Sequence, residues 1–167
     1  VLTFIAASAQ ERTIGLIRNE EGSFEGYTLF APIMYTTTYL INNEGLLVHS
    51  WESTYAPGLS VYLSTGGYLY RAITTGASAR FENLGGGVEK LDWEGNVLWH
   101  YEYGGDEHTQ HHDIEFMPNG NVLMLVWEHK NFTESVAAGR DPNALNADGV
   151  WSESVIEVEP TGDTTGN

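Results

Sequence analysis

Short apolar runs separated by glycine-containing turns are the main pattern along the chain, and one such unit occurs twice. Residues 39–51 (YLINNEGLLVHSW) and 89–101 (EKLDWEGNVLWHY) share an apolar residue followed by Asn or Asp, then Glu-Gly, then an apolar pair. Gly45 and Gly95 stand where such a turn needs a positive φ, which glycine adopts at little steric cost. Each segment is therefore predicted to form a β-hairpin.

A second type of hairpin alternates with the first. Residues 60–70 (SVYLSTGGYLY) match residues 114–124 (IEFMPNGNVLM) when Gly66 is aligned with Gly120. The Pro-Asn-Gly sequence that ends at Gly120 is a strong turn signal. These two segments are predicted to form hairpins as well.

The alternation of the two hairpin types predicts the fold. A third copy of the first type starts at residue 154 and aligns on Gly162. Four strands in about fifty residues are the unit of a β-propeller blade. The sequence thus predicts an all-β protein, a β-propeller of four-stranded antiparallel blades; a β-sandwich with similar hairpins is the alternative. Roughly two to three blades fit in this chain, fewer than a closed propeller needs, so we expect part of a longer protein.

One segment, residues 129–150, interrupts the repeat. Within it, Glu134 to Gly139 are predicted to form one or two helical turns, with Thr133 as the N-cap and Gly139 at the end. Insertions of this kind lie at the rims of propeller blades, where they cover or line a site.

The first nine residues have the features of the end of a signal peptide. The run Leu2–Ala7 is apolar, and small residues at positions 7 and 9 match a signal-peptidase site with cleavage before Gln10. A plain first β-strand is the alternative. We therefore expect a secreted or periplasmic protein in which residues 10–167 form the partial propeller domain.

Composition narrows the classes of function. The net charge is −16 with only seven Lys and Arg residues, so nucleic acid and anionic membranes are not expected partners. The absence of cysteine excludes thiolate catalysis, disulfides and cysteine-ligated zinc. No apolar run approaches the length of a membrane span. The sequence has no Walker loop, Gly-x-Ser-x-Gly or His-Glu-x-x-His motif, and no cofactor or metal is predicted.

Histidines cluster in residues 108–113 (HTQHHD), just before a predicted strand. His108 and His111 have a spacing found in metal sites, and Asp113 or Glu107 could add an oxygen ligand. Neighbouring side chains of a strand point to opposite faces, so His111 and His112 cannot both face one ion without a bulge. The other interpretation is that His112, or its neighbour His111, faces the propeller channel as a nucleophile, a general acid or base, or a donor to an anion.

The alternation of side chains along a strand predicts which face each residue after the histidines occupies. Asp113 and Glu115 are predicted to share one face of the strand, and His112, Ile114 and Phe116 the other.

Arg80 and Arg140 are candidate substrate-binding residues. Each stands in a long predicted loop next to small residues, and a guanidinium fork suits a sulfate or phosphate group. Ordinary surface arginines are the alternative.

Several segments resemble the N-terminal part of the arylsulfotransferase family. The likeness extends over about residues 13–163 and is most specific in the hairpins and in the His-His-Asp segment. The segments are GYTLFAP (26–32), TTTYLINNEGLLVHSWES (36–53), PGLSVYL (57–63), GGGVEKLDWEGNVLWHYEY (85–103), HHDIEFMPNGNVLMLVWE (111–128) and AAGRDP (137–142).

This resemblance implies an exported, six-bladed propeller enzyme that moves a sulfuryl group from an aryl sulfate ester to a phenol. The family needs no nucleotide donor such as PAPS and works through a sulfated histidine, with helper histidines and an arginine on the sulfate oxygens. It implies a supporting role for His111 or His112 and places the sulfated histidine in a later blade, beyond Asn167. The chain alone is then expected to be inactive and, with blade faces uncovered, to self-associate.

Two other classes of function remain open at this point. A propeller of this kind could recognise a ligand without catalysis. A metal-dependent lyase or hydrolase would use the histidine cluster instead.

Overall fold

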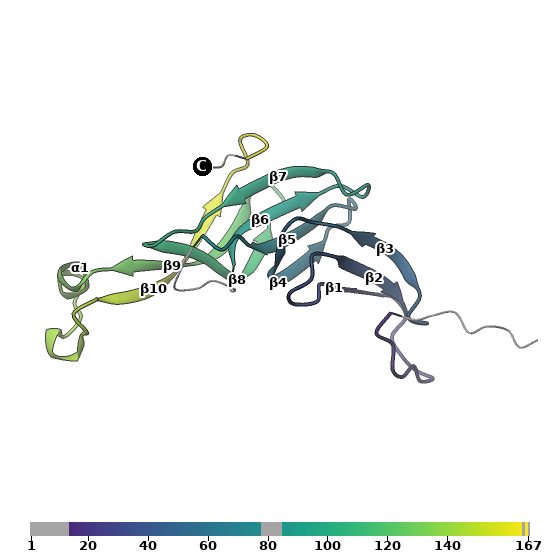
Figure 1. The fold of residues 1–167 in the computed structure, drawn as a ribbon, viewed down its shortest axis with the longest axis horizontal. Coiled ribbons are helices and arrows are strands. Elements are labelled where there is room, and N and C mark those ends of the chain that lie inside the picture. Colours follow the sequence, from purple (N-terminus) through teal and green to yellow (C-terminus); the bar gives the residue numbers. More distant parts are fainter. Residues whose placement is uncertain (1–13, 78–84, 165, 167) are drawn as a thin grey trace, which may run out of the picture.

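Antiparallel hairpins follow one another along the chain and assemble into three sheets (Figure 1). The computed structural model describes residues 14–77, 85–164 and 166. The first sheet contains β1 (Tyr27–Phe30), β2 (Thr38–Asn42) and β3 (Leu47–Trp51). The second contains β4 (Ala56–Leu63), β5 (Leu69–Thr74), β6 (Gly86–Leu91) and β7 (Val97–Glu102). The third contains β8 (His108–Phe116), β9 (Val122–Lys130) and β10 (Val150–Val158).

The predicted all-β, antiparallel class is confirmed, because each strand pairs with its neighbour in sequence within all three sheets. The described residues form no closed ring of sheets. The predicted signal-peptide remnant at residues 1–9 lies outside the described residues. Among the residues that are described, no helix is long and apolar enough to cross a membrane.

Turns of the first hairpin type are built as the sequence predicts. Gly45 has φ 74° and Gly95 has φ 87°. The Gly45 N–H donates to the carbonyl of Asn42 at 3.0 Å, and the Asn42 side chain accepts from the Leu46 N–H at 2.9 Å. Asp92 makes the same two bonds in the second copy. The shared Asn or Asp therefore stabilises the turn through its side chain.

In the second hairpin type, the alignment of Gly66 with Gly120 is wrong by one residue. The positive φ falls at Gly67 (80°), which donates to the Ser64 carbonyl as Gly120 donates to that of Met117. Two adjacent glycines both suit such a turn, and the hydrogen bond to the residue three positions earlier selects the second of them.

Strand β4 contains a bulge that turns out to matter for the site. Pro57 pairs with Ile73 and the next pair is Val61 with Arg71, so the register shifts and β4 has extra residues against β5. At the centre of the bulge Leu59 has φ 88°. Leucine rarely adopts this conformation, which costs about 1–3 kcal/mol.

Strand β8 has the same bulge at the equivalent place, one repeat further on. Gln110 pairs with Val126 and the next pair is Ile114 with Met124. His112 occupies the position of Leu59 and has φ 55°. Two neighbouring sheets thus share an unusual backbone feature, which the hydrophobic pattern did not predict.

Apolar side chains fill the spaces between successive sheets. Strand β8 packs against β4, β5 and β6, and β4 lies against β1. One cluster lies between the first and second sheets and contains Leu40, Trp51, Leu69 and Leu91. A larger cluster joins the second and third sheets and contains Tyr70, Ala72, Val88, Trp99, Ile114, Val122, Met124, Val126 and Val158.

The interruption of the repeat forms an arm. Strands β9 and β10 extend away from the body, and α1 (Phe132–Ala137) and a 3₁₀ turn (Pro142–Ala144) lie at the tip (Figure 1). Strand β10 begins at Val150, earlier than the start expected at residue 154.

The N-cap of α1 is Asn131, not the predicted Thr133. The Asn131 side chain accepts from the Glu134 N–H at 3.0 Å, and the Glu134 carboxylate accepts from the Asn131 N–H at 2.9 Å. Both residues can cap a helix, but only Asn131 has Glu three positions later to complete a capping box. Gly139, with φ 98°, follows the helix where its end was predicted.

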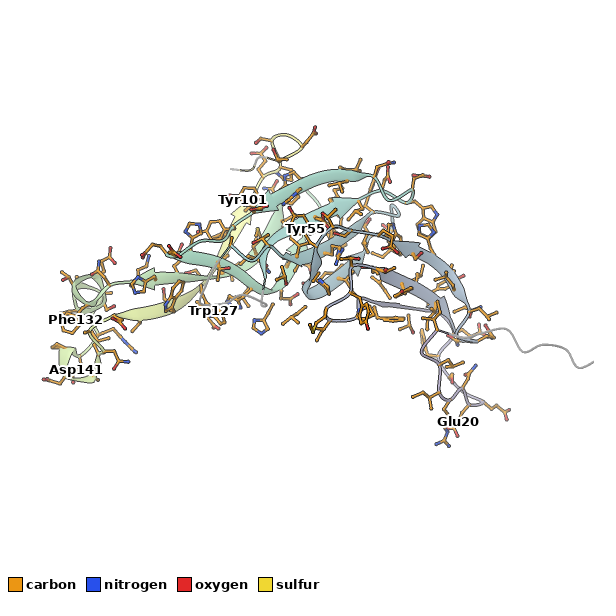
Figure 2. All side chains as sticks on the ribbon, viewed as in Figure 1. Glu20, Tyr55, Tyr101, Trp127, Phe132 and Asp141 are labelled. Carbon is orange, nitrogen blue, oxygen red and sulfur yellow. The ribbon has the colours of Figure 1, made fainter. Side chains whose placement is uncertain are left out.

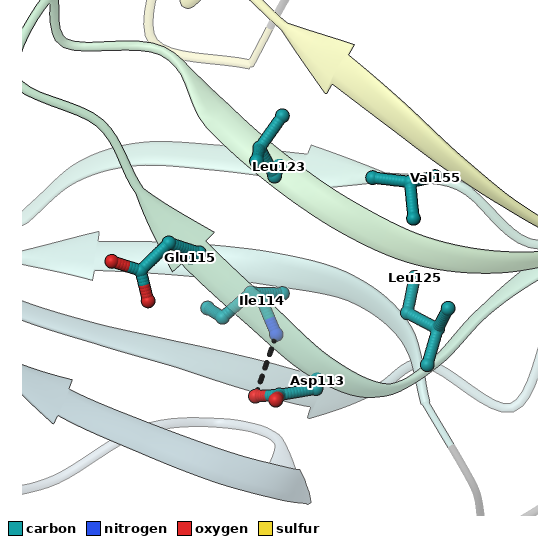
Figure 3. A pocket seen from close by; sticks show the side chains of 6 residues that line it. All are labelled: Asp113, Ile114, Glu115, Leu123, Leu125 and Val155. Carbon is teal, nitrogen blue, oxygen red and sulfur yellow. Dashed lines mark hydrogen bonds between the residues drawn. The ribbon is translucent and has the colours of Figure 1, made fainter.

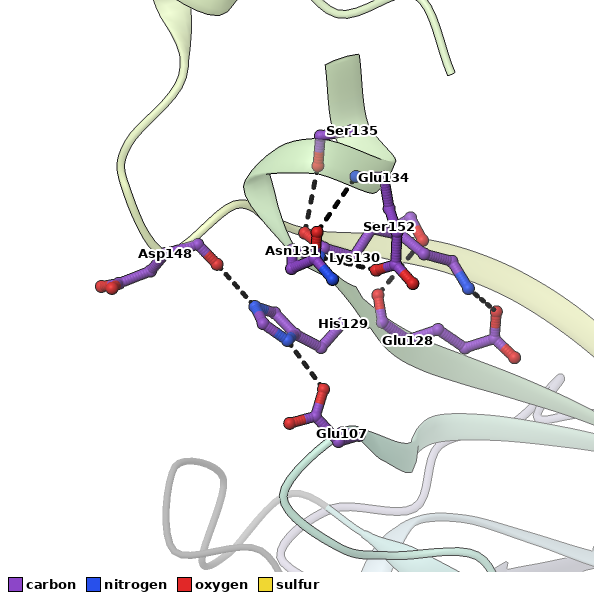
Figure 4. Close-up of polar contacts among 9 residues, drawn as sticks. All are labelled: Glu107, Glu128, His129, Lys130, Asn131, Glu134, Ser135, Asp148 and Ser152. Carbon is purple, nitrogen blue, oxygen red and sulfur yellow. Dashed lines mark hydrogen bonds and ion pairs between the residues drawn. The ribbon is translucent and has the colours of Figure 1, made fainter. Parts of the chain in front are cut away.

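His129 attaches the base of the arm to the body (Figure 4). Its Nδ1 lies 2.8 Å from a carboxylate oxygen of Glu107, in the loop before β8, and its Nε2 lies 2.6 Å from the Asp148 carbonyl. These contacts join three segments that are distant in sequence.

Candidate functional site

An open pocket of about 600 Å³ lies where the three sheets meet. It takes its lining from β1 and the residue after it, from the bulge of β4 and from the bulge of β8, so every sheet contributes a wall. The lining residues are Leu29, Phe30, Ala31, Leu59, Ser60, Val61, Tyr62, His112 and Asp113.

The bulge of β8 decides which side chains reach this pocket. Strand β8 begins at His108, so the histidines lie within the strand rather than before it. His111 is buried, with 1% of its surface exposed, whereas His112 and Asp113 are both exposed. The predicted alternation, with His112 and Asp113 on opposite faces, is therefore wrong at this point, because the extra residues of a bulge break strand parity.

His111 and His112 form a pair despite being adjacent in sequence. Their Nδ1 atoms lie 2.9 Å apart, and the His111 ring stacks on Trp127 with the ring centres 3.9 Å apart. Because a hydrogen bond needs one donor and one acceptor, the two Nδ1 atoms share one proton. The imidazoles therefore cannot both be protonated at Nδ1 while the bond is present.

Burial assigns the neutral member of the pair. Burial of His111 lowers its pKa, and the neighbouring His112 lowers it further, against a smaller opposing effect of Glu153 and the Val126 carbonyl. His111 is thus held neutral near pH 7, and its Nδ1 accepts a hydrogen bond when His112 carries the shared proton. Because the Nδ1 of His112 bonds to His111, the Nε2 of His112 is left for a ligand whichever ring donates.

Asp113 is fixed by two donors that both bond to Oδ1. The Tyr62 hydroxyl donates to it at 2.7 Å. The Ile114 N–H donates to it at 2.9 Å (Figure 3). The hydrogen bond to Asp113 is the main cause that raises the pKa of Tyr62 to about 12, with partial burial and the charges of Asp113 and Glu115 acting in the same direction. Tyr62 is therefore protonated at neutral pH and serves as a donor, not as a base.

Of the two predicted arginines, the structure describes Arg140 and does not place it at the pocket. Arg140 is exposed in the segment after α1, and its neighbour Asp141 lies at the tip of the arm, far from Trp127 beneath the histidine pair (Figure 2). Arg80 lies outside the described residues. Arg71 is buried beside Glu89, with Nη1 3.6 Å from the carboxylate.

No metal-binding group of three or more His, Cys, Asp or Glu side chains occurs in the described part of the chain. His108, the third member of the sequence cluster, packs on Tyr103 with the ring centres 4.3 Å apart. The cluster therefore divides into a pair at the pocket and a packing residue.

Sequence reasoning missed Leu59 and Tyr62 as pocket residues. Both belong to the PGLSVYL segment, to which the sequence assigns a hairpin strand and a family resemblance but no site residue. The sequence alignment of Gly66 with Gly120 matches Leu59 with Asp113. Only the structural alignment of Gly67 with Gly120 brings Leu59 to the position of His112.

Compared with known proteins, the chain matches no family model and no curated protein. The fold and the site alone define the class: an antiparallel β protein with a pocket that joins an apolar wall to a histidine pair.

Proposed function

We propose that the chain is part of an exported arylsulfotransferase-like β-propeller enzyme that transfers a sulfuryl group from an aryl sulfate ester to a phenolic acceptor. The observation that supports this most is the histidine pair, in which a buried neutral imidazole bonds to an exposed one at a pocket. Aryl sulfate and phenol are the partners, and no nucleotide cofactor takes part.

The propeller part of this proposal is supported by the repeat. Two successive sheets carry the same bulge at the same position, and the first strand of the later sheet packs on the earlier one. Bulges near the inner edges of sheets re-aim side chains towards sites. A ring of such sheets would direct one bulge from each blade towards a common axis.

In the proposed reaction the histidine pair supports the sulfuryl group and does not carry it. As the S–O bond to the aryl oxygen breaks and an S–N bond to a nucleophilic histidine forms, negative charge develops on the departing phenolate. A protonated His112 would donate through Nε2 to a sulfuryl or phenolate oxygen and through Nδ1 to His111. Preorganised donors of this kind contribute roughly 10²–10³ in rate.

The test is sulfuryl transfer by the natural full-length protein with 4-nitrophenyl sulfate and phenol, followed by nitrophenol release. His112→Gln should lower kcat/KM by about 10²-fold, since Gln removes the protonated donor. His108→Gln is the matched control, because His108 lies in the same strand but packs on Tyr103 outside the pocket. A folded full-length protein that releases no nitrophenol, or a His112→Gln variant as active as the control, would contradict the proposal.

A second function, ligand binding without catalysis, is favoured by the charge of the pocket. Among the described residues, its lining contains no Lys or Arg and includes the carboxylate of Asp113. From this described lining, an anionic sulfate would meet a favourable charge only from a protonated His112. If 4-nitrophenol binds as tightly as its sulfate ester at pH 7 and no transfer occurs, the binding function replaces the catalytic one.

A further inference from the structure

Leu59 combines two features that packing does not explain. Its φ of 88° lies in the left-handed region, which favours glycine, and its side chain is 42% exposed. A strained backbone conformation persists where other interactions of the residue offset its energetic cost. Burial in the core cannot be that interaction here, because an exposed leucine side chain removes little apolar surface from water. Strain at an exposed apolar side chain that lines a pocket points to contact with a ligand.

The equivalent bulge in β8 supports this interpretation. It places His112 into the same pocket with the same register shift and also with a positive φ, of 55°. The fold therefore uses one local conformation twice, once to present an apolar side chain and once to present an imidazole. Because both strands supply residues to one pocket, the two side chains can contact the same ligand.

The two sides of the pocket differ in chemistry. Leu59 is accompanied by Leu29, Phe30 and Val61, whereas His112 is accompanied by Asp113 and the hydroxyl of Tyr62. The volume of about 600 Å³ is in the usual range for small-molecule sites. A ligand that suits this arrangement has an apolar body and a polar group at one end.

We infer that Leu59 is a specificity-determining residue that packs on the apolar body of such a ligand while the polar group faces His112. The identification of that body as the aryl ring of a sulfate ester rests on the proposed function. The contact itself does not, because it requires only an amphipathic small molecule.

The experiment measures binding of 4-nitrophenol, 4-nitrophenyl sulfate and inorganic sulfate to the chain by ligand-observed NMR or calorimetry. Leu59→Gly is the decisive variant, since glycine adopts φ 88° without strain and removes the contact. It should bind both nitrophenyl ligands about tenfold more weakly, bind sulfate unchanged, and melt at the same or a higher temperature. Leu59→Asn, which tolerates the backbone and keeps a side chain of similar length, should also lose affinity.

The matched control is Leu47→Asn, an exposed leucine in β3 that does not line the pocket. It should leave all three affinities unchanged. Nitrophenyl binding that is absent in the wild type, or equal in the wild type and in Leu59→Gly, overturns the inference. Binding that depends on Leu59 without any sulfuryl transfer by the full-length protein upholds the inference and overturns the proposed function.

Discussion

At the scale of the residue, the site depends on side chains whose hydrogen bonds fix their protonation. His111 is neutral because it is buried, and its Nδ1 can then accept from His112. Tyr62 is held as a donor by Asp113. Each of these states follows from an environment created by distant segments, since Tyr62 and Asp113 are 51 positions apart in the sequence.

Tyr62→Phe tests the polar side of the pocket. It removes one hydrogen bond to a carboxylate and should lower the free energy of unfolding at pH 7 by about 1 kcal/mol. Because the pKa of Tyr62 is raised from 10.0 to about 12, its contribution to stability is fully present below pH 10 and is lost as the pH rises towards 12. Urea unfolding at pH 7 and absorbance titration at 295 nm measure the two effects.

The same prediction has a clear contrary outcome. Burial and neighbouring carboxylates also raise the pKa of Tyr55 and Tyr103, so the difference between the two proteins is the test. A titration above pH 10 that is the same in the wild type and in Tyr62→Phe would show that the hydroxyl does not bond to Asp113 in solution.

At the scale of the element, the arm formed by β9, α1 and β10 depends on one close approach of backbone. Gly149 has φ 84°, and a Cβ at this position would collide with the carbonyl of Lys130 and the backbone of Asn131. The hairpin can therefore turn back towards β10 only with glycine here. Gly139 has φ 98° but open space around it, so it needs glycine for conformation alone.

These two glycines form a matched pair of variants. Gly139→Ala should cost about 1–2 kcal/mol from the left-handed backbone, whereas Gly149→Ala should cost about 2–4 kcal/mol because the collision adds to it. Hydrogen exchange of the β9 and β10 amides measures the stability of the arm. Equal protection in the two variants would mean that the arm is packed differently from the structure.

At the scale of the whole molecule, the outward face of the third sheet is equivalent to the face of the second sheet that is buried. Val88 pairs with Ala72 and is fully buried under the third sheet, whereas its counterpart Val155 pairs with Leu125 and is 64% exposed. Leu123 and Leu125 line the same exposed hollow beside Val155 (Figure 3). An apolar sheet face of this kind favours association when nothing covers it.

We therefore expect the chain by itself to self-associate through this face. Val155→Lys should shift the sedimentation coefficient towards that of the monomer, because burial of a charge opposes association. Val48→Lys is the control, since Val48 is also exposed in a strand but belongs to the first sheet. Sedimentation velocity over a range of concentrations is the measurement, and a wild-type monomer at all concentrations would refute the expectation.

The sequence by itself determined the local parts of this protein. The hairpins, the turns at Gly45, Gly95 and Gly120 and the helix that stops before Gly139 follow from apolar periodicity and from the conformational freedom of glycine, which act over a few residues. The histidine cluster was also visible as a candidate site.

Only the tertiary structure decided which of these histidines matters and what stands opposite it. The bulge in β8 is set by pairing with the neighbouring strand, and no glycine at its centre marks it in the sequence. The predicted alternation of side chains was therefore wrong at His112 and Asp113. The pocket needs β1, β4 and β8 side by side, and packing between sheets brings them together. Local patterns cannot encode that arrangement, because it depends on contacts between residues far apart in the chain.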